Sequence, residues 1–224
     1  MRDTAHSGST DDDGATGPGA TPSTAERILE AARALMRDAG ADHVAVTAIA
    51  RRLGMSHSNV YRFFPNKAAL LDAVMTAWLR EIEDTLAATV EAMPAPVDRL
   101  AAYVLTLQDE MRRRARADPA DFAAYAALSE RAAGAMTAHA TRCRAILEAI
   151  LRDGIAREAF AIANVTAAAR AIDNATLSLR HPKLVHQALA TAADGSGEPA
   201  GDAASVSGEE AEDLVVLILD GIRR

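Results

Sequence analysis

The sequence predicts an all-α protein with an N-terminal helix-turn-helix domain of three helices and a larger C-terminal helical domain. Half of the 224 residues are hydrophobic but only 4% are aromatic, and an alanine-rich chain of this kind favours packed helices over sheets. Residues 46–71 contain two short helical segments joined by a glycine. Elsewhere, apolar residues recur at helical spacing. The length accommodates one large domain or two smaller ones.

The first 23 residues form an acidic stretch without an apolar core. They consist mainly of Gly, Ser, Thr, Asp and Pro, and Asp11, Asp12 and Asp13 stand together. Such a segment buries too little apolar surface to order itself, so residues 1–23 are predicted to be a disordered tail. Arms that reach a DNA minor groove are basic, and this acidic stretch does not fit that role.

Residues 24–40 are predicted to form the first helix. Ser23 or Thr24 can cap it, and Glu26 lies where the positive end of the helix dipole favours an acid. Gly40 supplies the stop. The apolar residues that recur at helical spacing are Ile28, Leu29, Ala32, Leu35 and Met36.

Two short helices and the start of a third follow. Thr47 is the expected N-cap of the first, because its hydroxyl can accept a hydrogen bond from a backbone N–H of the first turn. Gly54 is expected to end this helix in the left-handed conformation. Ser56 then caps the second helix, Pro65 ends it, and Asn66 caps the third.

The order helix, glycine turn, helix is the geometry in which the second helix enters the major groove of DNA. Residues 43–71 contain no Asp or Glu, although the whole chain has a net charge of −7. Four basic residues of this stretch are Arg51, Arg52, Arg62 and Lys67. A basic, acid-free surface fits contact with phosphates, so we interpret residues 24–71 as a DNA-binding domain. The alternative is an ordinary three-helix core fragment with solvated charges.

Residues 56–71, S-H-S-N-V-Y-R-F-F-P-N-K-A-A-L-L, resemble the signature of the TetR (tetracycline-repressor-like) family of transcriptional regulators. That signature has Ser, three variable residues, an aliphatic residue, Tyr, a variable residue, an aromatic residue and Phe. A short turn, Lys and a Leu-rich helix start follow. The preceding helix, which begins A-E-R-I-L-E, also resembles the first helix of the family, so the resemblance covers residues 24–75. Members often carry Gly where this chain has Ser58, so the operator sequence does not carry over.

The helix-turn-helix supplies the expected DNA contacts. Residues at the start of the second helix lie at the end that usually reaches base edges. Asn59 can pair with adenine N6 and N7, and His57 can donate to guanine. Thr47, Tyr61 and Lys67 resemble the phosphate contacts of the family, which position the domain without reading sequence. The full set of expected DNA-contacting residues is Thr47, Arg51, His57, Ser58, Asn59, Tyr61, Arg62 and Lys67.

The resemblance implies a homodimer whose C-terminal domain, residues 72–224, binds a small effector and joins the protomers. A long helix over residues 67–93 begins in the DNA-binding module and ends in this domain, so its tilt can set the distance between two DNA-binding heads. The effector cavity is expected among residues of the middle helices that are mostly apolar, as pockets for small molecules are. These are Trp78, Tyr103, Leu107, Met111, Phe122, Tyr125, Met136, His139, Cys143 and Asn174. Alternatively, they simply fill the core.

His139 and Cys143 stand four residues apart on one predicted helix. Two ligands are too few for a zinc site, so no metal or cofactor is expected. Cys143 is the single cysteine, which excludes a disulfide within the chain and fits a reducing compartment. The first 23 residues lack the apolar core of a signal peptide, and no apolar run is long enough to span a membrane. We therefore expect a cytoplasmic protein.

Two C-terminal segments are expected to form the dimer interface. Residues 165–179 carry a stripe of small and branched residues, and residues 214–222 form a terminal helix that is apolar nearly all round. Paired with their symmetry mates they make a four-helix bundle with two-fold symmetry, which requires a near-palindromic DNA operator. The expected interface residues are Val165, Ala169, Ile172, Thr176, Leu214, Leu217, Ile218 and Gly221. A flexible loop is expected near residues 192–208.

No catalytic arrangement emerges from the sequence. It contains no recognisable glycine loop that cradles phosphate, no paired carboxylates at helical spacing and no Ser/His/Asp arrangement, so the chain is not predicted to be an enzyme. We interpret it as a DNA-binding transcriptional regulator, a repressor released from its operator by a small apolar effector. The alternatives are a helical enzyme or small-molecule-binding protein with an incidental helix-turn-helix, and a constitutive DNA-binding or architectural protein without an effector.

Overall fold

The structure, a computed structural model, describes residues 22–193 and 208–223 of the chain. Most of the tail predicted over residues 1–23, and the loop predicted near 192–208, lie outside the described residues. Apart from an isolated bridge between Phe160 and Arg223, the regular elements of the described ranges are helices. The all-α prediction is therefore confirmed.

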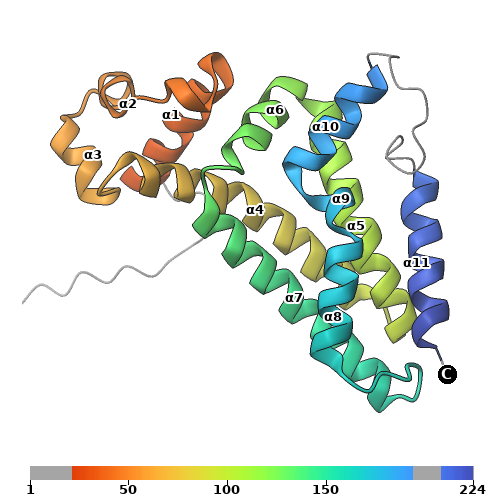
Figure 1. The fold of residues 1–224 in the computed structure, drawn as a ribbon. Helices are drawn as coiled ribbons and strands as arrows, with labels where there is room; N and C mark the ends of the chain where they lie inside the picture. Colours follow the sequence, from red (N-terminus) through yellow and green to blue (C-terminus); the bar gives the residue numbers. More distant parts are fainter. Residues whose placement is uncertain (1–21, 194–207, 224) are drawn as a thin grey trace, which may run out of the picture.

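The N-terminal lobe, residues 24–63, contains three helices and a single short 3-10 turn. These elements are α1 (Thr24–Ala39), the 3-10 turn Ala41–His43, α2 (Val46–Leu53) and α3 (His57–Phe63). Figure 1 shows the lobe to one side of the remaining helices. Ile28, Ile49 and Val60 are fully buried, one from each helix, and form its small core.

Local hydrogen bonds set the ends of these helices. The Ser23 hydroxyl accepts from the Glu26 backbone N–H at 3.2 Å, and the Glu26 carboxylate accepts from the Ser23 N–H at 2.7 Å. This reciprocal pair is a capping box that fixes the start of α1. Gly54 ends α2 with φ 64° and ψ 32°, the left-handed region that glycine enters without a Cβ penalty. Ser56 and Asn66 cap the next two helices as predicted.

The predicted N-cap of α2 is wrong. The residue at that position is Ala45, which makes no side-chain capping bond, and Thr47 lies inside the first turn with its side chain exposed. Ala45 has extended backbone angles and Val46 behind it is buried. Burial of Val46 against the lobe core therefore sets the start of the helix instead of a hydroxyl cap.

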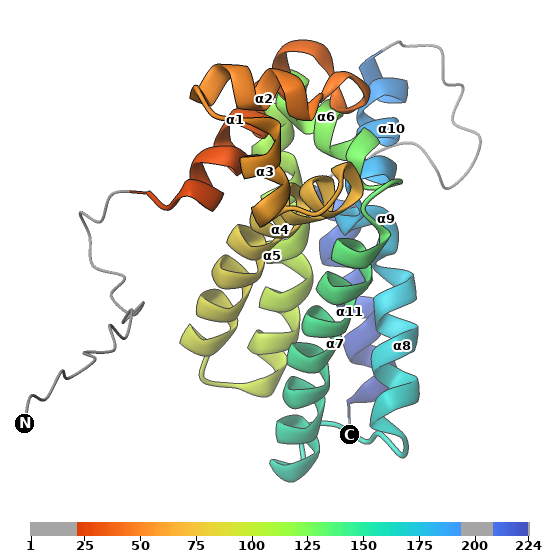
Figure 2. The ribbon, with the colours of Figure 1, turned by 90° about the vertical axis from the view of Figure 1, so that its left-hand side faces the viewer.

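The C-terminal bundle, formed by α4 to α11, holds the main core. Its helices are α4 (Lys67–Ala92), α5 (Pro96–Ala117), α6 (Pro119–Leu128), α7 (Ala133–Ala156), α8 (Val165–Ala175), α9 (Leu177–Arg180), α10 (Pro182–Ala193) and α11 (Gly208–Ile222). The long helix α4 leaves the N-terminal lobe and packs against both α5 and α7, which also contact each other. Helix α11 lies against α5, and Figure 2 shows it near α8 on the side where the chain ends.

Two positions in this bundle shape the packing of its helices. Gly134 lies in the first turn of α7. A Cβ there would come within 2.8 Å of the Asp72 carboxylate on α4, so the glycine permits close packing of the two helices. The expected continuous stripe over residues 165–179 is also interrupted at Thr176, which lies between α8 and α9. Its hydroxyl donates back to the Ile172 carbonyl at 2.9 Å.

Candidate functional site

The exposed side of α2 and α3 carries most of the residues that the sequence predicts to contact DNA. The Ser56 hydroxyl accepts from the Asn59 N–H and fixes the start of α3. Val60 is fully buried and holds α3 against the lobe core, so the opposite side of the helix faces outward. The exposed candidates are Thr47, Arg51, His57, Ser58, Tyr61, Arg62 and Lys67.

Asn59 lies differently from its neighbours. It is half-buried, and its side-chain amide nitrogen lies 4.0 Å from Sδ of Met55 in the turn between α2 and α3. Base contact by Asn59 requires this side chain to rotate outward. His57 and Ser58, by contrast, are exposed at the start of α3, so both are accessible without rearrangement.

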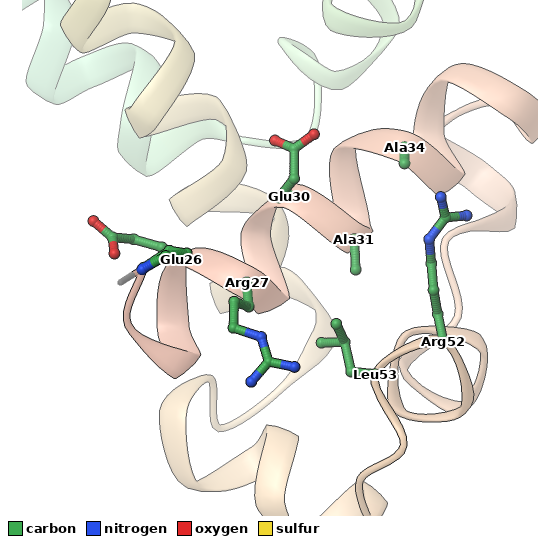
Figure 3. Close-up of a pocket in the computed structure, with 8 residues that line it drawn as sticks. Glu26, Arg27, Glu30, Ala31, Ala34, Arg52 and Leu53 are labelled. Atoms are coloured by element: carbon green, nitrogen blue, oxygen red, sulfur yellow. The ribbon is translucent and has the colours of Figure 1, made fainter. Parts of the chain in front are cut away.

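A hollow of about 540 Å³ lies between α1 and α2 on the N-terminal lobe. Figure 3 shows Arg52 and Leu53 on the α2 side of the hollow and Arg27, Ala31 and Ala34 on the α1 side. Arg52 extends toward Ala34, so it lies beside this hollow. The predicted effector residues lie elsewhere, in the C-terminal bundle.

The predicted effector residues mostly fill the core of the C-terminal bundle. Trp78 stacks on Tyr125 with ring centroids 4.7 Å apart, and Phe122 lies 6.3 Å from Trp78. Met136 is half-buried, and Asn174 is exposed on α8. The residues at most 3% exposed are Trp78, Tyr103, Leu107, Met111, Phe122, Tyr125, His139 and Cys143. Their packing is that of a filled core, and the structure does not bring Asn174 to them.

The aromatic stack contacts two arginines that sequence reasoning missed, and one of them belongs to the N-terminal lobe. Arg33 of α1 lies 5.8 Å from the Tyr125 ring centroid, and Arg114 of α5 lies 5.2 Å from that of Trp78. Glu81 of α4 pairs with both, at 3.5 Å to Arg33 and 3.0 Å to Arg114. These contacts connect α1, α4, α5 and α6, and we call the five residues the lobe junction. No local pattern could have identified it, because its members come from four helices.

Helices α4 and α7 are joined by a buried carboxylate. Glu83 accepts from Arg142 at 2.5 and 2.9 Å and lies 2.7 Å from Nδ1 of His139. Burial opposes ionisation of Glu83, but these hydrogen bonds outweigh it and lower the pKa of the carboxyl. Burial also raises the pKa of the nearby Cys143 thiol to about 12. The thiol is therefore neutral at pH 7, and its sulfur lies 3.6 Å from Nε2 of His139.

A second buried carboxylate, Asp173 of α8, accepts from two arginines. Arg144 of α7 donates at 2.8 Å, and Arg180 of α9 donates both to this carboxylate and to the Asp173 carbonyl. Asp173 is 3% exposed and Arg180 is 7% exposed. Sequence reasoning missed this cluster. Arg180 follows the interruption at Thr176 and lies seven residues after Asp173, whereas Arg144 lies 29 residues before Asp173 on another helix.

An apolar surface lies where α8 meets α11. A hollow of about 260 Å³ there is lined by Ala168, Ala171, Ile172, Ala175, Leu217, Ile218, Gly221 and Ile222. Val216 and Leu217 are 57% and 69% exposed. Among the predicted dimer residues, Ala169, Ile172 and Thr176 are instead buried within the protomer. The apolar part of the α8 surface beside α11 is therefore formed mainly by Ala168, Ala171 and Ala175.

Within residues 22–193 and 208–223, no helix is both long and apolar enough to cross a membrane. The same ranges hold no group of three or more His, Cys, Asp or Glu placed to bind a metal ion.

Two family models match separate parts of the chain. One, described as "Bacterial regulatory proteins, tetR family", matches residues 28–74, which include α2 and α3. The other, described as "Tetracyclin repressor-like, C-terminal domain", matches residues 96–196. The two lobes of the structure are thus matched by models of one family.

Curated relatives match a shorter stretch. An uncharacterized HTH-type transcriptional regulator of Mycobacterium bovis is 38% identical over 84 residues, which cover 34% of this chain and 44% of the relative. A regulator of the same description from Mycobacterium tuberculosis is 37% identical with the same coverage. The chain therefore spans less than half the length of the curated relatives it matches.

Solved structures share the fold over most of the chain. A putative transcriptional regulator from Pseudomonas aeruginosa is 16% identical with a TM-score of 0.60, covering 88% of both chains. FadR from Bacillus subtilis, in complex with stearoyl-CoA, is 14% identical with a TM-score of 0.58, covering 88% of this chain and 98% of that one. A TetR/AcrR regulator from Thermobifida fusca is 19% identical with a TM-score of 0.58, covering 89% and 98%.

Proposed function

We propose that the chain, which belongs to the TetR family of bacterial transcriptional regulators, is a homodimeric repressor that a small effector releases from its operator. The observation that carries the proposal is the exposed surface of α2, α3 and the start of α4. It presents Arg51, Arg62 and Lys67 on a stretch without acidic residues, in a chain whose net charge is −7. Such a local concentration of positive charge is favourable for phosphate contact.

In the proposed complex, α3 lies in the major groove with its first turn toward the bases. His57 and Ser58 are the first candidates for base contact, because both are exposed at that end of the helix. Asn59 joins them when its amide leaves Met55. The proposed phosphate contacts are Thr47, Arg51, Tyr61, Arg62 and Lys67, which position the helix.

The proposed dimer interface is the apolar surface formed by α8 and α11. Leu217, which lines the hollow and is 69% exposed, is the most exposed large apolar residue there, and a neighbouring copy would cover it. The small side chains of Ala168, Ala171 and Ala175 allow close approach of a second helix. Two copies then make a four-helix bundle with two-fold symmetry and bind a near-palindromic operator.

The proposed effector site lies in the core of the C-terminal bundle, around Trp78, Tyr103 and the middle helices. Bacillus subtilis FadR, which has the same fold, is known in complex with stearoyl-CoA, and this supports a small-molecule site in the fold. An effector shifts the equilibrium only if it binds one conformation better than the other. The lobe junction offers a route, because displacement of Trp78 or Tyr125 would disturb the contacts that Arg33 of α1 makes.

The salt dependence of binding to labelled duplex DNA tests the DNA-binding surface. Lys67→Ala should weaken binding to all sequences and lower the slope of log K against log salt by about one unit. Lys183→Ala is the matched control, because Lys183 is a lysine at the start of α10, where it pairs with Glu130. Equal effects of the two substitutions would remove α3 and the start of α4 from the DNA-binding surface.

A further inference from the structure

Two arginines line the hollow of about 540 Å³ between α1 and α2. Arg27 and Arg52 are both exposed, and Figure 3 shows Leu53 between their guanidinium groups. Among residues 22–193 and 208–223, neither arginine forms an ion pair with a carboxylate. The hollow therefore carries positive charge that the described part of the chain does not neutralise.

Two acidic residues also line the hollow, but both are turned to other uses. The Glu26 carboxylate accepts from the Ser23 N–H at 2.7 Å and caps α1. Figure 3 shows the Glu30 carboxylate pointing away from Arg52 and Leu53. The ligand that best complements this hollow is therefore an anion.

The chain itself carries carboxylates a short distance before the hollow. Pro22 lines the hollow, and the chain continues from it toward the N-terminus. Asp11, Asp12 and Asp13, which we call the acidic triplet, stand nine to eleven residues before Pro22. The connecting residues 14–21 contain three glycines and no charged residue. No closer carboxylate in this connection competes with the acidic triplet for the arginines.

The connection is long enough for the acidic triplet to reach both arginines. Nine residues span at most about 30 Å when fully extended, and a glycine-rich chain of that length has a mean end-to-end distance of about 17 Å. Arg52 extends toward Ala34, which lies about 15 Å along α1 from Thr24. A tether of this length holds the triplet near the hollow at a millimolar effective concentration. Ion pairs that are weak between separate molecules are favoured under this condition.

We propose that the acidic triplet docks in this hollow against Arg27 and Arg52, and that it thereby competes with DNA phosphates for the basic surface of the N-terminal lobe. Arg51, a proposed phosphate contact, is the neighbour of Arg52 in α2. Charges at this separation act on each other within about one Debye length at physiological salt. The docking stands on the hollow and the sequence before it, whereas its effect on DNA affinity rests on the proposed function.

Paramagnetic NMR of the full chain tests the docking without DNA. A nitroxide attached to Ala15→Cys labels the N-terminal segment alone, because the native Cys143 is fully buried. At low salt it should broaden the backbone amide signals of Ala34 and Leu53 in the hollow. Replacement of the acidic triplet by three asparagines leaves the tether unchanged and should reduce this broadening at least about twofold. Equal broadening with and without the triplet would overturn the docking.

Affinity for labelled duplex DNA of random sequence tests the competition. The three-asparagine protein should bind about threefold to tenfold more tightly than the wild type at about 50 mM salt, and the gain should vanish near 0.5 M. The matched control makes the same change in net charge on the C-terminal bundle, with Asp84→Asn, Glu91→Gln and Glu158→Gln at exposed positions. An equal gain in both proteins would be a general effect of net charge and would contradict the competition.

A double-mutant cycle assigns the gain to the hollow. Arg27→Gln with Arg52→Gln removes both positive charges at exposed positions, so the lobe should remain folded. In that background, the three asparagines should change DNA affinity by less than about 1.5-fold. The same gain in both backgrounds would mean that the arginines act on DNA independently of the acidic triplet, and it would overturn the proposal.

Failure of this inference is distinguishable from failure of the proposed function. Broadening that depends on the acidic triplet, in a chain that does not bind DNA, would support the docking and remove the DNA-binding role. DNA binding through α3 without any response of NMR signals or affinity to the triplet would retain the proposed function and overturn the inference.

Discussion

The N-terminal lobe and the C-terminal bundle are held together by interactions of different range. In the lobe, Ser23 bonds to Glu26 and Ser56 to Asn59, each three residues away. In the bundle, Glu83 bonds to His139, which is 56 residues away. Interactions between residues close in sequence determine where a helix begins and which side of it is exposed. Interactions between residues far apart in sequence determine how whole helices pack against each other. A lobe built locally can present a rigid DNA-binding surface, while a bundle built from distant contacts can respond to a ligand in its core.

The largest effect is expected at the surface of α11 in the C-terminal bundle, because dimerisation there would bring two N-terminal lobes to one operator. Leu217→Glu should leave the protomer folded, because Leu217 is 69% exposed there. In a dimer the new carboxylate would be buried without a partner, at a cost of several kcal/mol. We expect a monomer by light scattering and a loss of operator binding of at least about a hundredfold. Glu212→Ala, on an exposed position of the same helix, is the control; a dimeric Leu217→Glu protein would move the interface elsewhere.

The next largest effect is on stability. It compares the loss of a buried carboxylate, Glu83, with the loss of an exposed one, Glu81, on the same helix α4. Glu83→Gln weakens the buried contacts with Arg142 and His139 and should cost about 2 kcal/mol, or roughly 4–8 °C in melting temperature. Glu81→Gln, whose side chain is 50% exposed, should cost less than about 1 kcal/mol. Thermal unfolding of both variants at pH 7 measures the difference. Equal losses would mean that the link between α4 and α7 does not stabilise the bundle.

The stability difference between the wild type and Glu83→Gln should also depend on pH. The pKa of Glu83 is lowered in the folded state from its ordinary 4.5, so its carboxylate contributes stability that is complete above that value. The contribution is lost as the pH falls through the lowered pKa, because the carboxylate is then protonated. The difference in melting temperature between the wild type and Glu83→Gln should therefore shrink below pH 4.5. A difference that is constant from pH 7 to pH 3.5 would exclude ionisation of Glu83 as its cause.

A smaller effect on stability is expected in the N-terminal lobe, at the left-handed glycine that ends α2. Gly54 has φ 64°, and a Cβ there would meet no atom within 4 Å. Gly54→Ala should therefore cost about 1 kcal/mol from backbone strain alone. Gly54→Asn should cost less, since Asn tolerates the left-handed region better. Chemical denaturation compares them, and an alanine variant as stable as the wild type would show that the turn can rearrange.

The smallest effect on stability is expected at Arg33. The same substitution tests whether an effector in the C-terminal bundle changes the DNA affinity of the N-terminal lobe. The pair of Arg33 with Glu81 is half-exposed at 3.5 Å, so Arg33→Ala should change the free energy of unfolding by less than about 1 kcal/mol. The response of DNA affinity to an effector should fall, because Arg33 connects α1 to the Tyr125 ring. Arg37→Ala, an exposed arginine one turn further along α1, serves as the control. An unchanged response would remove the lobe junction from the regulatory route.

The sequence allowed prediction of the lobe in more detail than the bundle. Four predicted helix ends are confirmed, because each depends on a hydrogen bond to a residue three or four positions away. They are set by Ser23, Gly54, Ser56 and Asn66. Thr47 is the exception, since burial of its neighbour set the start of α2. Such burial depends on tertiary packing, which a capping rule does not include.

In the bundle, the sequence predicted helices and apolar residues but not their partners. Trp78, Tyr103 and Tyr125, which were predicted as effector residues with core packing as the alternative, are all buried. The ion pair between Asp173 and Arg144 was not predictable, because it depends on how α7 packs against α8, and the two residues are 29 positions apart in the chain. The inward orientation of Ala169 and Ile172 was missed for a related reason: a stripe of small residues does not reveal which neighbouring helix covers it.

Selection of bound sequences from a pool of random duplex DNA tests the central claim most directly. A two-fold dimer that reads DNA through α3 should enrich a near-palindromic motif, with half-sites centred about 34–36 Å apart or a multiple of it. His57→Ala with Ser58→Ala should lose that enrichment but keep salt-sensitive binding to the unselected pool. Enrichment of a motif without two-fold symmetry, or the same motif with the double variant, would contradict the account.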